Sequence, residues 1–88
     1  EPKARAAATR VLTYWRDRVP QPLDLFSAQI NDENASVRLH AIWGLSYFTG
    51  KDAAKASEVA VESLIHPQDG YLKFQLDETT KTLDRRKK

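Results

Sequence analysis

Apolar side chains recur every three or four residues along most of the chain, which is the spacing of an amphipathic helix. No segment alternates apolar and polar residues with the period of a β-strand. The pattern predicts five helices, which cover residues 2–17, 22–30, 34–50, 52–65 and 70–85. The segment from Val19 to Pro22 separates the first two, because proline disfavours helix in the residue before it. We therefore expect an all-α fold.

The third predicted helix, residues 34–50, is apolar around nearly its whole circumference. One side carries Val37, Ala41, Leu45 and Phe48, with Ile42 at its edge, and the adjoining side carries His40, Trp43 and Tyr47. A helix of this kind must be covered by neighbours on more than one face, so we expect it to be the central and most buried helix. Asn34 is suited to cap its start, and Gly50 to close its end in the left-handed conformation.

Each of the other helices has one apolar face that we expect to be buried. These faces are Ala4, Ala8, Val11, Leu12 and Trp15; then Leu23, Phe26 and Ile30; then Ala53, Ala56, Ala60 and Leu64, with Val61 and Ile65 beside them; and finally Leu72, Leu76, Thr80 and Leu83. Asp52 and Asp69 precede the last two helices and are expected to cap them.

The first, third and fifth helices align at offsets of 33 and 35 residues. Arg5, Arg38 and Lys73 then share one position, and Ala8, Ala41 and Leu76 share another. The helices between them align so that Phe26 and Ile30 meet Val61 and Ile65. Such a period predicts a stack of helical hairpins of about 34 residues, each covering the face that the next one cannot bury alone. The five helices make about two and a half hairpins.

Residues 32–38, DENASVR, followed by Ala41 and Leu45, resemble the D-x-x-x-x-V-R-x-x-A-x-x-x-L signature of HEAT repeats. The resemblance implies a right-handed α–α superhelix with the Asp in the turn between two helices and the Arg opening the second. It also implies a structural ladder of hydrogen bonds between repeats, made by Asp32, Arg38, Arg5 and Lys73, in which we expect Asp32 to be the partner of Arg38. The alternative is that Arg38 binds an anion. The third unit has Pro67 in place of the Asp, and the first lacks its opening helix.

Residues 8–20 and 66–83 also resemble segments of large bacterial proteins described as membrane-bound dehydrogenases, which combine a β-propeller, a HEAT region and a c-type haem domain. The resemblance implies a larger parent protein that is an oxidoreductase and is periplasmic or exported. Its chemistry would belong to other domains, because this sequence has neither propeller strands nor a C-x-x-C-H motif.

Composition narrows the chemistry that the chain itself can perform. Its 88 residues suffice for a single domain, residues 1–88, and because the chain begins with Glu1 we expect it to be a piece of a longer protein. Without cysteine there is no disulfide, thiol nucleophile or haem attachment. No apolar run approaches the ~20 residues that cross a bilayer. Asp77 and Glu78 are adjacent and cannot converge as an acid–base pair. We expect no catalytic residue, no cofactor and no metal site.

The leading functional hypothesis is a non-catalytic scaffold that binds a protein or a neighbouring domain of the same chain. Its candidate interaction surface is His40, Trp43 and Tyr47, although a stripe of this kind also serves as packing between repeats. One hairpin is incomplete and the stack lacks polar caps, so we expect modest stability or weak self-association.

The alternative hypothesis is a nucleic-acid-binding domain that uses Arg5, Arg38, Lys73 and the basic tail, residues 85–88. Residues 1–18 carry five basic and two acidic side chains, and residues 70–88 carry six and three. Between them, residues 19–69 carry three basic and seven acidic side chains. That acidic middle segment would interrupt the positive field that nucleic-acid binding needs.

Overall fold

The structure, a computed structural model, describes residues 2–86, so the last two lysines of the basic tail lie outside the described residues. Within this range the chain forms α1 (Pro2–Trp15), α2 (Pro22–Ile30), α3 (Ala35–Leu45), α4 (Lys51–Val61), the 3-10 helix η1 (Glu62–Ile65) and α5 (Gly70–Arg86), and no β-strand. The predicted all-α fold of five helices is confirmed.

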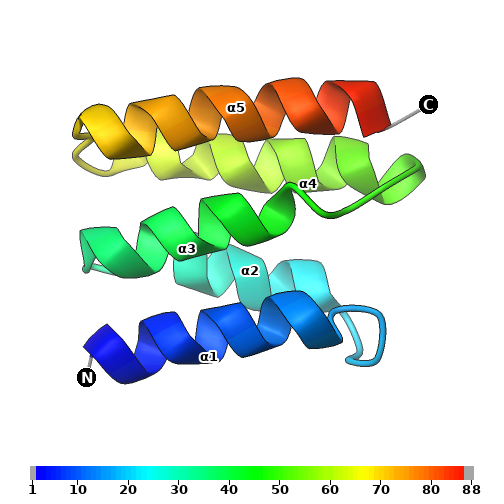
Figure 1. The fold of residues 1–88 in the computed structure, drawn as a ribbon, viewed down its shortest axis with the longest axis horizontal. Coiled ribbons are helices and arrows are strands. Elements are labelled where there is room, and N and C mark those ends of the chain that lie inside the picture. The colour runs from blue at the N-terminus through cyan, green and yellow to red at the C-terminus, as the bar shows by residue number, and fades with distance from the viewer. Residues whose placement is uncertain (1, 87–88) are drawn as a thin grey trace.

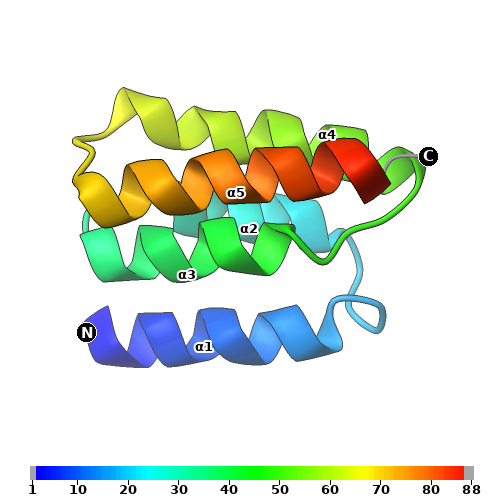
Figure 2. The same ribbon diagram turned by 45° about the horizontal axis from the view of Figure 1, so that its top comes forward.

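The helices form two layers (Figures 1 and 2). α1, α3 and α5 lie side by side and run in the same direction, while α2 and α4 run the opposite way in the second layer. The hairpins are α2–α3 and α4–α5, and α1 is a single helix packed on α3. α3 contacts all four other α-helices, and six of its eleven residues are buried. Its central position follows from its nearly continuous apolar circumference.

The start of α3 is as expected, but its end is not. The Asn34 side chain accepts hydrogen bonds from the N–H groups of Ser36 and Val37, at 2.9 and 3.3 Å. The helix ends at Leu45, five residues before the predicted Gly50. Gly50 has φ +61° and ψ −140° and directly precedes α4. The predictions that Gly50 closes the third helix and that Asp52 caps the fourth are therefore wrong, since Asp52 lies in the first turn of α4.

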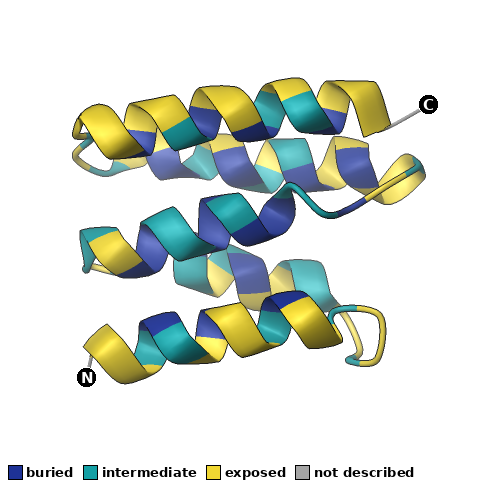
Figure 3. Ribbon diagram, viewed as in Figure 1, coloured by how far each residue is buried: buried dark blue, intermediate teal, exposed yellow. Residues whose placement is uncertain are grey.

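The predicted buried face of α1 is wrong except at Leu12, which is partly buried against the core (Figure 3). The buried residues are Ala6, Thr9 and Thr13, whereas Val11 is 56% exposed and Trp15 is 49% exposed. Ala4 and Ala8 are exposed as well. The physical reason is that α1 packs chiefly on α3, and the side of α1 that α3 covers carries mostly small residues. Both buried hydroxyls donate to carbonyls one turn earlier in α1, Thr9 to that of Arg5 and Thr13 to that of Thr9.

A glycine allows α3 to approach α1 and α2 closely. A Cβ added at Gly44 would lie 2.4 Å from Thr13 Oγ1 and 2.7 Å from the Phe26 ring. Since Cβ atoms do not come this close to other heavy atoms, no residue larger than glycine fits without a shift of the neighbouring helices. Gly44 thus sets the spacing at the centre of the fold.

The alignment of Phe26 and Ile30 with Val61 and Ile65 is wrong as well. Val61, Leu64 and Ile65 are exposed, and Ser63 is buried in place of Leu64. The helix tightens to a 3-10 turn after Val61. With three residues per turn instead of 3.6, Leu64 and Ile65 rotate out of the α-helical row. Val61 still belongs to α4 but lies outside its buried row of alanines. In α5, Thr79 is buried rather than the predicted Thr80, and its hydroxyl donates to the carbonyl of Ile42 at 3.1 Å.

Candidate functional site

The residues of the expected ladder join neighbouring repeats in an unexpected order. Arg5 donates two hydrogen bonds to the Asp32 carboxylate, Nε to Oδ2 at 2.7 Å and Nη2 to Oδ1 at 3.1 Å. Arg38, which is 4% exposed, donates instead to two main-chain carbonyls, that of Asp32 at 2.8 Å and that of Pro67 at 3.2 Å. Arg38 is thus a partner of the Asp32 main-chain carbonyl rather than of its carboxylate, which accepts from Arg5 and from the N–H group of Asn34.

The pKa of Asp32 is lowered from its ordinary value of 3.8. The hydrogen bond from Arg5 is the main cause, the N–H group of Asn34 adds to it, and partial burial opposes both. The Asp32 side chain is one-tenth exposed, and that of Arg5 about one-third. The pair is therefore partly shielded from water, and the carboxylate is bound in its charged form.

The cations at the repeated position do not form an open row along the described stack. Arg38 is buried and Arg5 is engaged by Asp32, so of the three only Lys73 is an exposed residue. Arg86, at the other end of α5, lies over the Tyr47 ring at 5.9 Å. A nucleic acid needs successive cations that can reach its phosphates, and this arrangement does not provide them at Arg5 and Arg38.

His40, Trp43 and Tyr47 are half-buried on α3 or directly after it. The rings of Trp43 and Tyr47 meet edge to face, with centroids 5.2 Å apart. The guanidinium of Arg16 lies over the Tyr47 ring at 5.3 Å. Tyr47 is thus engaged by neighbouring side chains, while His40 and Trp43 border a groove.

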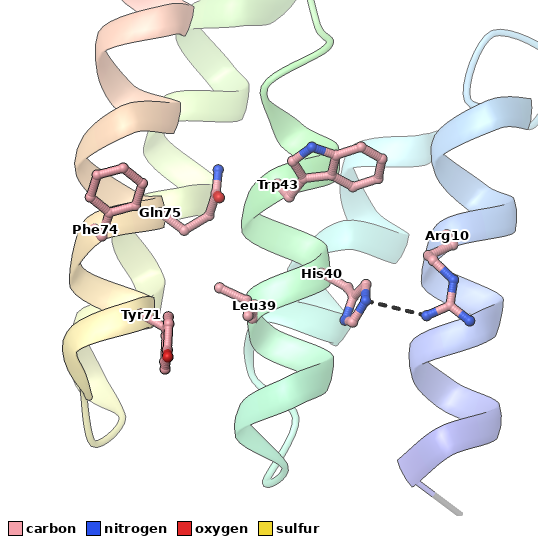
Figure 4. A pocket seen from close by; sticks show the side chains of 7 residues that line it. All are labelled: Arg10, Leu39, His40, Trp43, Tyr71, Phe74 and Gln75. Carbon is pink, nitrogen blue, oxygen red and sulfur yellow. Dashed lines mark hydrogen bonds between the residues drawn. The ribbon is translucent and has the colours of Figure 1, made fainter.

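This groove, which we call the aromatic groove, lies between α3 and α5 and has a volume of about 370 Å³ (Figure 4). Its lining residues are Leu39, His40 and Trp43 of α3, Tyr71, Phe74 and Gln75 of α5, and Arg10 of α1. Tyr71 is 79% exposed and Phe74 is 66% exposed. Sequence reasoning missed Arg10, Tyr71 and Phe74. The available signal was that Tyr71 and Phe74 fall three residues apart and outside the buried face of the fifth helix.

Arg10 and His40 form a hydrogen-bonded pair at the edge of the aromatic groove. His40 Nδ1 lies 2.8 Å from the carbonyl oxygen of Ser36, and Nε2 lies 3.2 Å from Arg10 Nη1. A carbonyl oxygen can only accept, so Nδ1 carries the proton, and Nε2 accepts from the guanidinium. The pair holds the exposed side chain of Arg10 against α3 and uses one of the five N–H donors of its guanidinium.

The described part of the chain contains neither a metal-ligating cluster nor a membrane-spanning helix. No group of three or more His, Cys, Asp or Glu residues among residues 2–86 could hold a metal ion. No helix in that range has the length and apolar character needed to span a membrane. The features that remain are the aromatic groove and its edge of one arginine and one histidine, which suit the binding of an apolar side chain beside a polar or charged group.

Stacked antiparallel hairpins with a groove on the surface of one helical layer define an α-solenoid repeat protein. The family of HEAT repeats matches residues 1–77, which include α1 to α4 and the first half of α5. The chain belongs to this family. HEAT repeats commonly mediate protein interactions and are generally non-catalytic. No curated protein and no solved structure was found to match the chain.

Proposed function

We propose that the chain is a non-catalytic module that binds a protein or a neighbouring domain through the aromatic groove. The observation that carries the proposal is the exposure of Tyr71 and Phe74 beside Trp43. Apolar surface in water is unfavourable by ~25 cal/mol per Å², and clustered aromatic side chains are typical of binding surfaces. Because these side chains project from packed helices, a partner would meet a largely preformed surface.

The strongest polar contacts of the chain support a scaffold rather than a reaction centre. Arg5 donates to the Asp32 carboxylate, and Arg38 donates to the main-chain carbonyls of Asp32 and Pro67, so these contacts fasten one repeat to the next. In this proposal the polar residues fix the curvature of the stack, and the aromatic residues of α3 and α5 meet the partner.

We further propose that the module orients larger domains within a bacterial dehydrogenase. Support comes from the resemblance of residues 8–20 and 66–83 to such proteins. The full reading frame of the gene tests this extension, which predicts a C-x-x-C-H haem motif outside the present sequence. A reading frame without one would refute the dehydrogenase parent and leave the binding module untouched.

The binding proposal is tested by panning a displayed library of random 12-residue peptides against the wild-type chain. Sequences enriched on the wild type should be lost on the double variant Tyr71→Ala/Phe74→Ala, because both side chains are exposed and line the aromatic groove. The matched control is Leu25→Ala, which removes an exposed apolar side chain from α2 in the other layer. Enrichment of no sequence, or equal enrichment on the double variant, would show that the groove is not the binding surface.

A further inference from the structure

A second hollow adjoins the aromatic groove on the other side of His40. It has a volume of about 580 Å³ and is lined by Pro2, Lys3, Ala6, Arg10, Asn34, Ser36 and His40. Arg10 and His40 line both spaces. Among the described residues that line the two spaces there are two cationic side chains and no carboxylate. The aromatic groove is therefore largely apolar, and Arg10 lies at the edge that it shares with the second hollow.

The helix termini add to this positive character. α1 and α3 run in the same direction, and both begin at the second hollow, where Pro2, Asn34 and Ser36 lie. Each helix start carries a partial positive charge that favours anions. The Asn34 side chain already accepts hydrogen bonds from two N–H groups of α3. The helix termini therefore act on an anion through their electrostatic field, and Arg10 is the residue that donates to it directly.

Arg10 is placed to hold an anion between the two spaces. Its guanidinium has five N–H donors, and among the described residues its recorded hydrogen-bond partner is His40. His40 is itself fixed by the Ser36 carbonyl, which keeps the arginine at the boundary between the hollows. A guanidinium with adjacent donors available binds a carboxylate through two parallel hydrogen bonds.

We infer that the ligand is an extended peptide segment with an acidic residue close in sequence to a large apolar residue. The carboxylate binds Arg10 at the second hollow, and the apolar side chain lies among Leu39, Tyr71 and Phe74 in the aromatic groove. This inference rests on the proposed function and specifies its partner. A peptide fits better than a nucleic acid, because the site offers one arginine beside apolar walls rather than successive cations along a path.

An array of synthetic octapeptides tests the inference. Each peptide has Phe at position four and, at one other position in turn, Asp, Glu, Asn, Gln or Lys, with Ser and Gly elsewhere. We expect Asp or Glu to strengthen binding about fivefold or more over Asn or Gln at some position within four residues of Phe. Arg10→Gln should abolish that preference while the dependence on Phe remains. Phe74→Ala should weaken binding of every peptide, and Lys55→Gln, an exposed residue of α4, should change nothing.

The outcomes separate this inference from the proposed function. Equal binding of the acidic and amide peptides, or an acidic preference that persists in Arg10→Gln, would overturn the inference and leave the groove a binding surface. Failure of all Phe-containing peptides to bind would overturn both. Displacement of bound peptide by a 20-nucleotide single-stranded DNA or RNA, with an affinity that falls steeply with salt, would identify a nucleic-acid site and also overturn the inference.

Discussion

Arg5 and Asp32 lie 27 residues apart in the sequence, yet the guanidinium of the first donates two hydrogen bonds to the carboxylate of the second. This contact ties α1 to the turn before α3. One repeat further on, Arg38 donates to the main-chain carbonyl of Pro67, 29 residues away, and ties α3 to the turn before α5. Successive repeats are thus fastened by arginines that reach forward to the following turn.

The Arg5–Asp32 pair should make stability depend on pH. The pKa of Asp32 is lower in the folded chain than its ordinary value of 3.8. The ion pair therefore contributes fully to the free energy of unfolding above that value, and its contribution is lost as the pH falls through the pKa of the folded state. A double-mutant cycle of Arg5→Gln and Asp32→Asn should give a coupling of about 1 kcal/mol at pH 7, which is modest because Arg5 is partly solvated. Urea unfolding of the wild type and the variants at pH values from 7 down to 2 measures this coupling. A coupling that is absent at pH 7, or that does not decline in acid, would contradict the assignment.

Arg38 should contribute to stability through main-chain partners. Arg38→Met removes the donors to the carbonyls of Asp32 and Pro67, and we expect a loss of about 1–3 kcal/mol in the free energy of unfolding. A double-mutant cycle of Arg38→Met and Asp32→Asn should show only weak coupling, because Asp32→Asn leaves the main-chain carbonyl of residue 32 in place. Coupling as large as that of the Arg5 pair would mean that Arg38 binds the carboxylate.

Gly44→Ala should destabilise the chain because the new methyl group would overlap Thr13 and Phe26. We expect a loss of about 1–3 kcal/mol, which for a domain of this size lowers the melting temperature by about 5 °C or more. The matched control is Gly70→Ala, where a Cβ meets no atom within 4 Å. Thermal unfolding followed by circular dichroism compares the two. Equal melting temperatures would show that α3 is not packed as closely as the structure indicates.

The exposed apolar face of α1 should promote self-association. Sedimentation at several concentrations should give an average mass that rises with concentration, and Ala8→Glu or Val11→Glu should restore a monomer without loss of helicity. Both residues are exposed, so the charges need not enter the core. Leu25→Glu, at an exposed apolar position of α2, is the control. A wild-type chain that stays monomeric throughout the range would refute the prediction.

Features that depend on neighbouring residues could be predicted from the sequence. Pro22 begins α2, and Asn34 caps α3, because a single proline ring or side-chain oxygen is enough for either. The central place of α3 was also predictable, since a helix that is apolar all round needs several neighbours. The buried face of α1 was not predictable, because periodicity identifies the residues that share a face but not the face that another helix covers.

The candidate site, too, could be predicted from the sequence only in part. The spacing of His40, Trp43 and Tyr47 indicated that they share one side of a helix. Arg10 and Phe74 line the same groove but belong to helices about 30 residues before and after α3 in the sequence. Their positions depend on how α1 and α5 pack on α3. The aromatic groove is a tertiary feature, which explains why a pattern read along one helix contained only part of it.

The bond between Arg38 and Pro67 places its evolutionary constraint on one partner alone. The acceptor is a main-chain carbonyl, which every amino acid supplies, so the identity of residue 67 can drift as long as the turn keeps its shape. Arg38 has no such freedom, because its guanidinium donates to two carbonyls, those of Asp32 and Pro67. A saturation-mutagenesis map should therefore show position 38 as intolerant and position 67 as permissive. Conservation measured at position 67 alone would underestimate a contact that holds two repeats together.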